Sequence, residues 1–332
     1  MLKFLRNSLE DIDDVIVDVA TSMKLPEVII EKDLYVSYIL DYLFSRSEFK
    51  NYFEFKGGTS LSKGYGLINR FSEDIDVVLK SEVIGENLEE IIHLESKSQK
   101  EKMAEKLNAK AIEFYKNKLI PSIMNDLKKE TNIPFKERLE EKELAIYLEY
   151  PTNHSDSYIP NAVKLEIGPL AAWTPCESIT LSSFIAQKYP NLFDKPDFPV
   201  LITRPVRTFW EKAVIMHQEA HRVDGKVPRH YSRHYYDLYK MYSSFVKQEA
   251  FDSLDLLEEV RRFTMTFYNR GWAKFEDAVP GSFMLYPNEK SLSALKADYN
   301  DMNNMMYGEI PYFEEVLSTI KKLEDEINGL KK

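Results

Sequence analysis

The sequence predicts an α+β fold in which a short mixed sheet lies between two helical parts of the chain. Three observations support this class. Apolar residues recur at helical spacing between residues 9 and 47, short β-rich runs bounded by Pro, Asn, Ser and Gly follow, and the chain from Thr208 onward is again mostly helical. The chain has 332 residues, of which 44% are hydrophobic and 13% aromatic. This composition excludes disorder over most of the length.

We divide the chain into three parts. Residues 1–48 should form N-terminal helices that pack on the core, and Pro26 should separate two of them, because proline disfavours helix at the preceding residue. Residues 49–203 should form the central domain that contains the sheet, and residues 204–332 a C-terminal helical domain. The clearest strand signals are residues 76–79, 144–150 and 162–167.

Composition also bears on the cellular context. No apolar run approaches the roughly 18 residues that a membrane span needs, and the N-terminus turns acidic where a signal peptide would need its apolar run. A single cysteine, Cys176, cannot form an internal disulfide and gives no metal cluster. We therefore expect a cytoplasmic protein without a membrane partner.

The charge is acidic overall but uneven. A net charge of −10 argues against sequence-blind coating of nucleic acid. Residues 201–240 nevertheless contain eight Lys or Arg against four Asp or Glu, together with four of the six histidines. A local cationic surface of this kind suits one polyanionic ligand held in one place, and a solvated helix face is the plainer interpretation.

A glycine-containing segment is the first part of the most informative stretch, residues 55–79. Gly57 and Gly58 allow the backbone to approach a ligand closely, and Thr59 and Ser60 can cap the helix that follows. The N-terminus of a helix presents free N–H groups and a positive dipole end. This segment therefore suits a phosphate group.

An acidic strand follows the glycine segment. Asp74 and Asp76 are two residues apart in an extended run, so both carboxylates should share one strand face, with Ile75 and Val77 on the other. Aligned carboxylates repel each other unless a cation lies between them. Magnesium prefers oxygen ligands and substrate phosphates, and Glu166, in a second short apolar strand, is the candidate third ligand.

The combination is more specific than its parts. An isolated Asp-x-Asp pair or a lone Gly-Gly-Thr-Ser segment is usually surface decoration. In the order phosphate loop, helix, acidic strand and later acidic strand, they indicate phosphoryl or nucleotidyl transfer that depends on Mg²⁺, with Mn²⁺ as an alternative.

This order resembles the nucleotidyltransferase superfamily with the polymerase-β-like fold. In detail, residues 56–63 and 70–76 look like the AbiEii/AbiGii toxin family of bacterial type IV toxin–antitoxin and abortive-infection systems. Other stretches similar to this family extend over nearly the whole chain: residues 31–33, 164–167, 207–212 and 232–239, and Asp298 with Met302 and Met305. Fifteen residues separate Gly58 from Asp74, somewhat more than is usual in the superfamily. Which residues between Gly57 and Ser60 touch phosphate therefore stays open.

The resemblance implies a function. Its members are nucleotidyltransferases that transfer NMP from an NTP, typically to the tRNA 3′ end, which blocks translation, and they have a cognate antitoxin. It also implies that Lys212 contacts the nucleotide phosphates and that Asp237 belongs to the active site. From the residues alone, Lys212 is costly to bury unless it meets a carboxylate or phosphate, and Asp237 could simply pair with Arg233 one helical turn earlier.

Several other side chains are candidates for ligand contacts. Lys56 or Lys63 could reach the triphosphate as a point charge, and a solvated position on the outer helix face is the alternative for Lys63. Ser72 could hydrogen-bond substrate or orient a carboxylate, or be an ordinary turn residue. His217 and His221 lack a third ligand at zinc-motif spacing, so we interpret them as core or phosphate-facing residues. We expect the RNA to be received by Arg204, Arg207, Arg229 and Arg233.

Two rival functions remain at this stage. One keeps the fold and changes the acceptor to a protein hydroxyl. The other is a nucleotide sensor without turnover, and the intact Asp74, Asp76, Lys212 and Asp237 argue against it.

Overall fold

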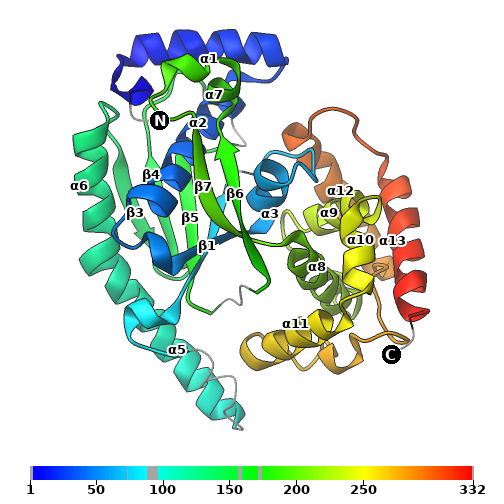
Figure 1. The fold of residues 1–332 in the computed structure, drawn as a ribbon. Helices are drawn as coiled ribbons and strands as arrows, with labels where there is room; N and C mark the ends of the chain where they lie inside the picture. Colours follow the sequence, from blue (N-terminus) through cyan, green and yellow to red (C-terminus); the bar gives the residue numbers. More distant parts are fainter. Residues whose placement is uncertain (1–2, 73, 88–95, 156–158, 171–173, 331–332) are drawn as a thin grey trace. The chain divides into compact units, whose positions relative to one another are not determined.

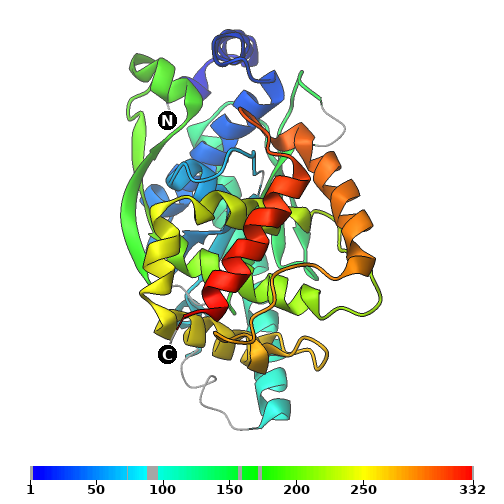
Figure 2. The same ribbon diagram turned by 90° about the vertical axis from the view of Figure 1, so that its right-hand side faces the viewer.

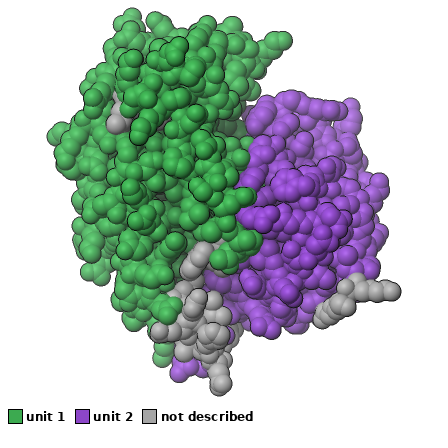
Figure 3. All heavy atoms as spheres, in the orientation of Figure 1, with its two compact units in different colours: residues 1–64, 71–91, 102–203 green, residues 65–70, 92–101, 204–332 purple. Residues whose placement is uncertain are grey.

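The computed structural model describes residues 3–72, 74–87, 96–155, 159–170 and 174–330 (Figure 1). A seven-stranded mixed sheet is accompanied by helices before and after it in the chain, so the predicted α+β class is confirmed. The chain divides into two compact units (Figure 3). Unit 1 contains residues 1–64, 71–91 and 102–203, and unit 2 contains residues 65–70, 92–101 and 204–332. The N-terminal residues 1–48 thus cluster with the sheet.

Unit 1 is built on the sheet, whose strand order is β3-β4-β5-β2-β1-β7-β6. Its central strands are joined in a mixed pattern, because β2 pairs antiparallel with β1 and parallel with β5, while β1 pairs parallel with β7. The strands are β1 (Phe53–Lys56), β2 (Asp74–Leu79), β3 (Lys136–Glu140), β4 (Ala145–Glu149), β5 (Ala162–Gly168), β6 (Cys176–Ser182) and β7 (Asp197–Thr203).

The two faces of the central strands differ in chemistry. Side chains alternate along a strand, and register partners lie on the same face. One face therefore carries Phe55, Val77 and Leu165, which are all buried. The other face carries charged residues from three adjacent strands: Lys56, Asp74, Asp76, Lys164 and Glu166. The charged face is where polar chemistry can take place.

The helices of unit 1 enclose the apolar core. They are α1 (Leu9–Met23), α2 (Glu27–Asp41), α3 (Gly57–Thr59), α6 (Ile120–Glu130) and α7 (Phe184–Lys188), and α5 (Lys97–Phe114) crosses the unit boundary at residue 102. The Ser8 hydroxyl caps α1 by accepting the Asp11 N–H. Pro26 stands just before α2, so α1 and α2 are separated where the sequence predicted. Helix α2 packs against β5 and β7 and is buried from Ile29 to Asp41.

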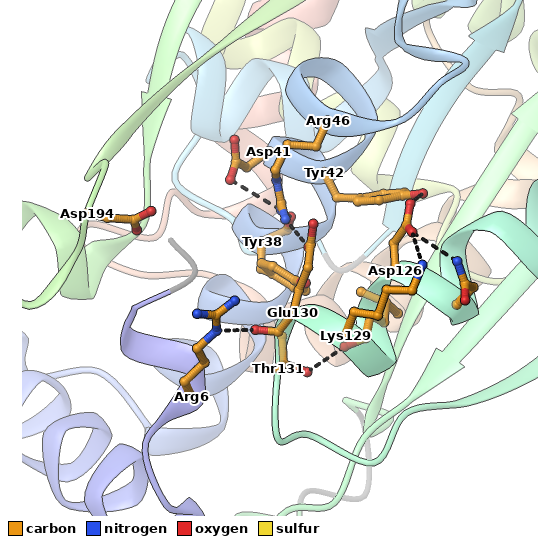
Figure 4. Close-up of polar contacts among 12 residues, drawn as sticks. Arg6, Tyr38, Asp41, Tyr42, Arg46, Asp126, Lys129, Glu130, Thr131 and Asp194 are labelled. Carbon is orange, nitrogen blue, oxygen red and sulfur yellow. Dashed lines mark hydrogen bonds and ion pairs between the residues drawn. The ribbon is translucent and has the colours of Figure 1, made fainter.

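A polar network joins α2 to the end of α6 (Figure 4). The Tyr38 hydroxyl donates to Glu130 Oε2 at 2.8 Å, and Arg46 forms an ion pair with the same carboxylate. Arg6, from the segment before α1, donates to the Glu130 backbone oxygen at 3.1 Å. The Arg46 and Glu130 side chains are partly buried, and charges in such a position are stabilised by pairing. The network fixes the N-terminal segment and α2 on the core.

Unit 2 consists mainly of helices: α8 (Pro205–Ala220), α9 (Ser232–Tyr242), α10 (Phe245–Phe251), α11 (Leu254–Phe267), α12 (Glu289–Met302) and α13 (Phe313–Asn328). Helix α9 packs against α8, α12 and α13, and Figure 2 shows α13 running along this group of helices. Asp298 of α12 accepts the backbone N–H groups of His230 and Ser232 at 2.6 and 2.8 Å, which caps the start of α9. None of the helices described here is both long and apolar enough to cross a membrane.

Candidate active site

The acidic strand β2 carries the centre of the candidate site in unit 1. Ile75 and Val77 are 0% and 2% exposed, whereas Asp74 and Asp76 on the opposite face are partly exposed. In the parallel register with β5, Asp74 lies beside Lys164 and Asp76 beside Glu166. The period-two alternation thus places both aspartates on the charged face of the sheet.

The glycine segment meets this strand at Gly57. Gly57 has a φ of +81°, a backbone conformation that favours glycine. A Cβ atom built on Gly57 would lie 1.8 Å from Asp76 Oδ2. Any side chain at position 57 would therefore occupy the place of the Asp76 carboxylate, so the missing side chain is what allows the loop and the acidic strand to touch.

Two hydroxyl groups hold the glycine segment: Thr59 joins it to the chain at the start of β2, and Ser60 bonds within it. The Thr59 hydroxyl donates to the backbone oxygens of Ser72 (3.1 Å) and Asp74, and the Ser60 hydroxyl donates to the Gly57 oxygen at 2.7 Å. The expectation that Thr59 or Ser60 caps the helix is wrong, because Lys56 occupies the N-cap position without a side-chain cap. Helix α3 continues directly into a π-helical turn, Ser60–Gly64. The two hydroxyls orient this segment and do not cap it.

The two candidate lysines of this segment differ in environment. Lys56 ends β1 in register with Asp76. Lys63 forms an ion pair with Asp33 of α2, with Nζ 2.5 Å from Oδ1, and both side chains are nearly buried. Asp33 Oδ2 also accepts the Phe184 N–H at 2.7 Å. A contact between Lys63 and a triphosphate would require this ion pair to open.

Lys164 is a charged neighbour of the acidic strand whose role the sequence analysis missed. Its Nζ lies 2.5 Å from Glu166 Oε1 and 3.1 Å from Glu143 Oε2. Burial opposes the charged form, but Glu166, Asp74 and Glu143 outweigh it and raise the pKa of Lys164. Its position two residues before Glu166, on the same strand face, is the signal that could have identified it.

The donor set of Asp74 and Asp76 consists of carboxylate oxygens, which fit a hard cation such as Mg²⁺. In the described part of the chain, no group of three or more His, Cys, Asp or Glu side chains is arranged to hold a metal ion. Glu166 is bonded to Lys164 in this arrangement. The site of Asp74, Asp76 and Glu166 for Mg²⁺ therefore stays a prediction.

Unit 2 contains a buried charged triad around Asp237. Arg70 donates to Asp237 through Nε at 2.7 Å and through Nη2 at 2.8 Å, which is a bidentate pair. Lys212 of α8 places its Nζ 2.8 Å from Asp237 Oδ2. A buried lysine needs a carboxylate or a phosphate as its partner, and Lys212 meets a carboxylate.

The electrostatics of the triad follow from its burial. Burial alone would raise the pKa of the Asp237 carboxyl, but Arg70 and Lys212 hold it well below its usual range. Burial lowers the pKa of the Lys212 ammonium, against the attraction of Asp237. Asp237 is therefore an ionised, fully buried carboxylate held between two cations.

The expected cationic wall of the basic window needs revision, whereas the core interpretation of His217 agrees with the structure. Arg207 is only 2% exposed and pairs with Glu211, so it cannot belong to an exposed cationic wall, whereas Arg229 and Arg233 are exposed. Arg204 forms an ion pair with Glu249 at 2.6 Å. His217 is a core residue, because its two ring nitrogens bond the Lys274 oxygen and the Met284 N–H.

The glycine segment contacts the Asp-x-Asp strand on a mixed sheet, as the resemblance to nucleotidyltransferases implied. The chain belongs to the family described as "Nucleotidyl transferase AbiEii toxin, Type IV TA system", whose family model matches residues 38–319. The fold is similar to that of MenT4, a nucleotidyltransferase toxin from Mycobacterium tuberculosis H37Rv, with a TM-score of 0.52 and 16% sequence identity. The match covers 95% of this chain and 90% of that one. A search of curated proteins gave no match.

Proposed function

We propose that this toxin transfers NMP from an NTP to an RNA acceptor, the 3′ end of tRNA, and thereby blocks translation in the cytoplasm. The observation that carries the proposal is the contact between Gly57 and Asp76, where a Cβ atom would lie 1.8 Å from the carboxylate oxygen. A triphosphate seated on the glycine segment would have its phosphates beside the two aspartates. Family membership supports the NTP and a cognate antitoxin as partners.

In this proposal, some residues of unit 1 bind the triphosphate and others bind the metal ion. The backbone N–H groups of Gly57 and Gly58 and the Lys56 ammonium would bind the triphosphate, and the Thr59 and Ser60 hydroxyls would keep the loop in place. Asp74 and Asp76 would hold Mg²⁺, which when bound neutralises phosphate charge. Lys63 and Ser72 are the remaining candidates for phosphate contacts, and Glu166 for metal binding.

The residues of unit 2 would supply charge at a fixed position. The Arg70, Lys212 and Asp237 groups sum to one positive charge, which supports a phosphate contact by Lys212. In the transfer step, the acceptor hydroxyl gives its proton to water and its oxygen forms a bond to the α-phosphorus. The bond from the α-phosphorus to the bridging oxygen breaks, and pyrophosphate leaves. The protein contributes positioning and electrostatic stabilisation.

The acceptor is tested by incubating the protein with Mg²⁺, each α-³²P-labelled NTP in turn, and total tRNA. Asp74→Asn and Asp76→Asn should each reduce the labelling of tRNA at least about 100-fold. The matched control is Asp197→Asn, an exposed aspartate at the start of β7, which should label tRNA as the wild type does. If only protein is labelled, the acceptor is a protein hydroxyl. If the protein binds NTP but nothing is labelled, the function is that of a nucleotide sensor without turnover.

A further inference from the structure

Unit 1 also contains a small cavity formed by α1, α2 and the segment after β4. Its volume is about 80 Å³. It is lined by Leu9, Ile12, Asp13, Ile16, Glu31, Tyr35 and residues 151–153. None of these residues belongs to the candidate active site, so the cavity needs its own explanation.

Polar atoms of Glu31, Asp13 and Tyr35, which line this cavity, lack hydrogen-bond partners among the described residues. Glu31 is 4% exposed; its Oε2 accepts the Thr152 hydroxyl, and its Oε1 receives no hydrogen bond from a described residue. Asp13 Oδ1 pairs with His154, and Oδ2 has no such donor among the described residues. The Tyr35 side chain is 1% exposed, and its hydroxyl makes no hydrogen bond with any residue that the structure describes.

The Glu31 carboxylate is nearly buried, whereas the Asp13 side chain is 29% exposed. A nearly buried carboxylate is stabilised by a positive charge beside it. A ligand that pairs with Glu31 and also reaches Asp13 and Tyr35 must present several N–H groups and a cationic charge. A metal ion fits less well, because Asp13, Glu31 and His154 are not placed as a metal-binding group in the described structure. The volume would hold two or three waters or one compact head group.

We propose that this cavity is a binding site for an organic cation, a guanidinium or primary ammonium group that donates hydrogen bonds to Glu31, Asp13 and Tyr35. The surrounding charge favours such a ligand, because α1 carries five acidic residues and no Lys or Arg. Leu9, which is 43% exposed, provides an apolar contact for the methylene groups that carry the cation. The site is independent of nucleotidyl transfer.

The affinity should increase with pH. Burial raises the pKa of Glu31 to about 7; the Thr152 hydrogen bond and the charges of His154 and Lys32 oppose the rise, and Asp13 adds to it. With that pKa, about one tenth of Glu31 is ionised at pH 6 and about nine tenths at pH 8. A cation that pairs with the ionised form should therefore bind about tenfold more tightly at pH 8 than at pH 6.

The test is isothermal titration calorimetry of the full chain with agmatine and with the peptide acetyl-Gly-Arg-Gly-amide. We expect a Kd of about 1 mM or lower for a cation that contacts all three side chains. We expect no binding of acetyl-Gly-citrulline-Gly-amide, the uncharged counterpart of the arginine peptide. If the arginine peptide binds more tightly than agmatine, the cation belongs to a polypeptide. If agmatine binds equally or more tightly, the cation is a free amine.

Variants localise the binding. Glu31→Gln should weaken agmatine binding at least about tenfold and remove its pH dependence, and Tyr35→Phe, which keeps the ring, should weaken it several-fold. Asp14→Asn is the matched control, because Asp14 is exposed on the same helix and does not line the cavity. Asp74→Asn should bind agmatine as the wild type does, whatever its effect on transfer. Absence of agmatine binding, or equal affinity in the wild type and in both cavity variants, would overturn the proposal.

Discussion

The sharpest test of the active-site geometry is the substitution Gly57→Ala. The new Cβ atom would lie 1.8 Å from Asp76 Oδ2, 2.5 Å from its Cγ and 2.8 Å from its Cβ. Real Cβ contacts are essentially never shorter than 3.0 Å, so the carboxylate oxygen must move by at least about 1.2 Å. The φ of +81° adds about 1–2 kcal/mol of backbone strain for any residue with a Cβ atom.

The displacement has a predicted effect on rate. A misplacement of about 1 Å in a catalytic arrangement can cost about 100-fold, so Gly57→Ala should lower the rate of nucleotide transfer by about that factor. The rate is measured as α-³²P-NMP incorporation, together with pyrophosphate release, so that the result does not depend on which acceptor is used.

A matched glycine separates the displacement from backbone strain. Gly85 lies in the same unit with a φ of +72°, and a Cβ atom there would meet nothing within 4 Å. Gly85→Ala should therefore share the strain and keep the transfer rate. If Gly57→Ala keeps a rate within about threefold of Gly85→Ala while Asp74→Asn is inactive, the carboxylate does not work from the position described here.

Three further predictions concern the stability of unit 2. Lys212→Met should lower the free energy of unfolding in urea by about 3–5 kcal/mol, because it removes a partner of buried Asp237. The double variant with Asp237→Leu should lose less free energy than the sum of the two single variants. Strictly additive losses would contradict the coupling of the two side chains. Asp298→Ala should cost about 1–2 kcal/mol through loss of the α9 cap, whereas exposed Asp301→Ala on the same helix should be nearly neutral. Burial lowers the pKa of His217 from 6.5 to about 4. His217 therefore contributes a free energy of unfolding that is fully present above pH 6.5 and falls by about 3 kcal/mol as the pH falls toward 4. In urea unfolding between pH 7.5 and 4, His217→Gln should lose less free energy of unfolding than the wild type, and an equal loss would assign the acid sensitivity to other groups.

The parts of the fold that the sequence predicted well have local signals. Strands β2 and β5 alternate apolar and polar residues, and the structure places them where the pattern indicated. Strand β3 gave no such signal, because its residues Lys136–Glu140 are four charged residues and one leucine. It is an edge strand that depends on antiparallel pairing with β4, and such pairing is set by tertiary contacts more than by propensity.

The candidate site also combines features that have a local sequence signal with features that depend on tertiary contacts. The carboxylates of Asp74 and Asp76 could be placed on one strand face from a two-residue spacing. The partners of Lys63 and Asp237 could not, because Asp33 is 30 residues from Lys63, and Arg70 is 167 residues from Asp237. The i,i+4 spacing of Arg233 and Asp237 suggested a local pair, but the Asp237 carboxylate oxygens bond Arg70 and Lys212.

The environment of Asp237 restricts the role that it can have. A general base needs a pKa near the working pH, and Arg70 and Lys212 keep the pKa of Asp237 well below its usual range. Both carboxylate oxygens already accept hydrogen bonds or ion pairs from these cations. Asp237 is therefore unsuited to remove a proton from an acceptor hydroxyl. Because its position is fixed by the bidentate Arg70 contact, it can hold the Lys212 ammonium in one place, which is what a lysine needs to meet a phosphate in a defined geometry.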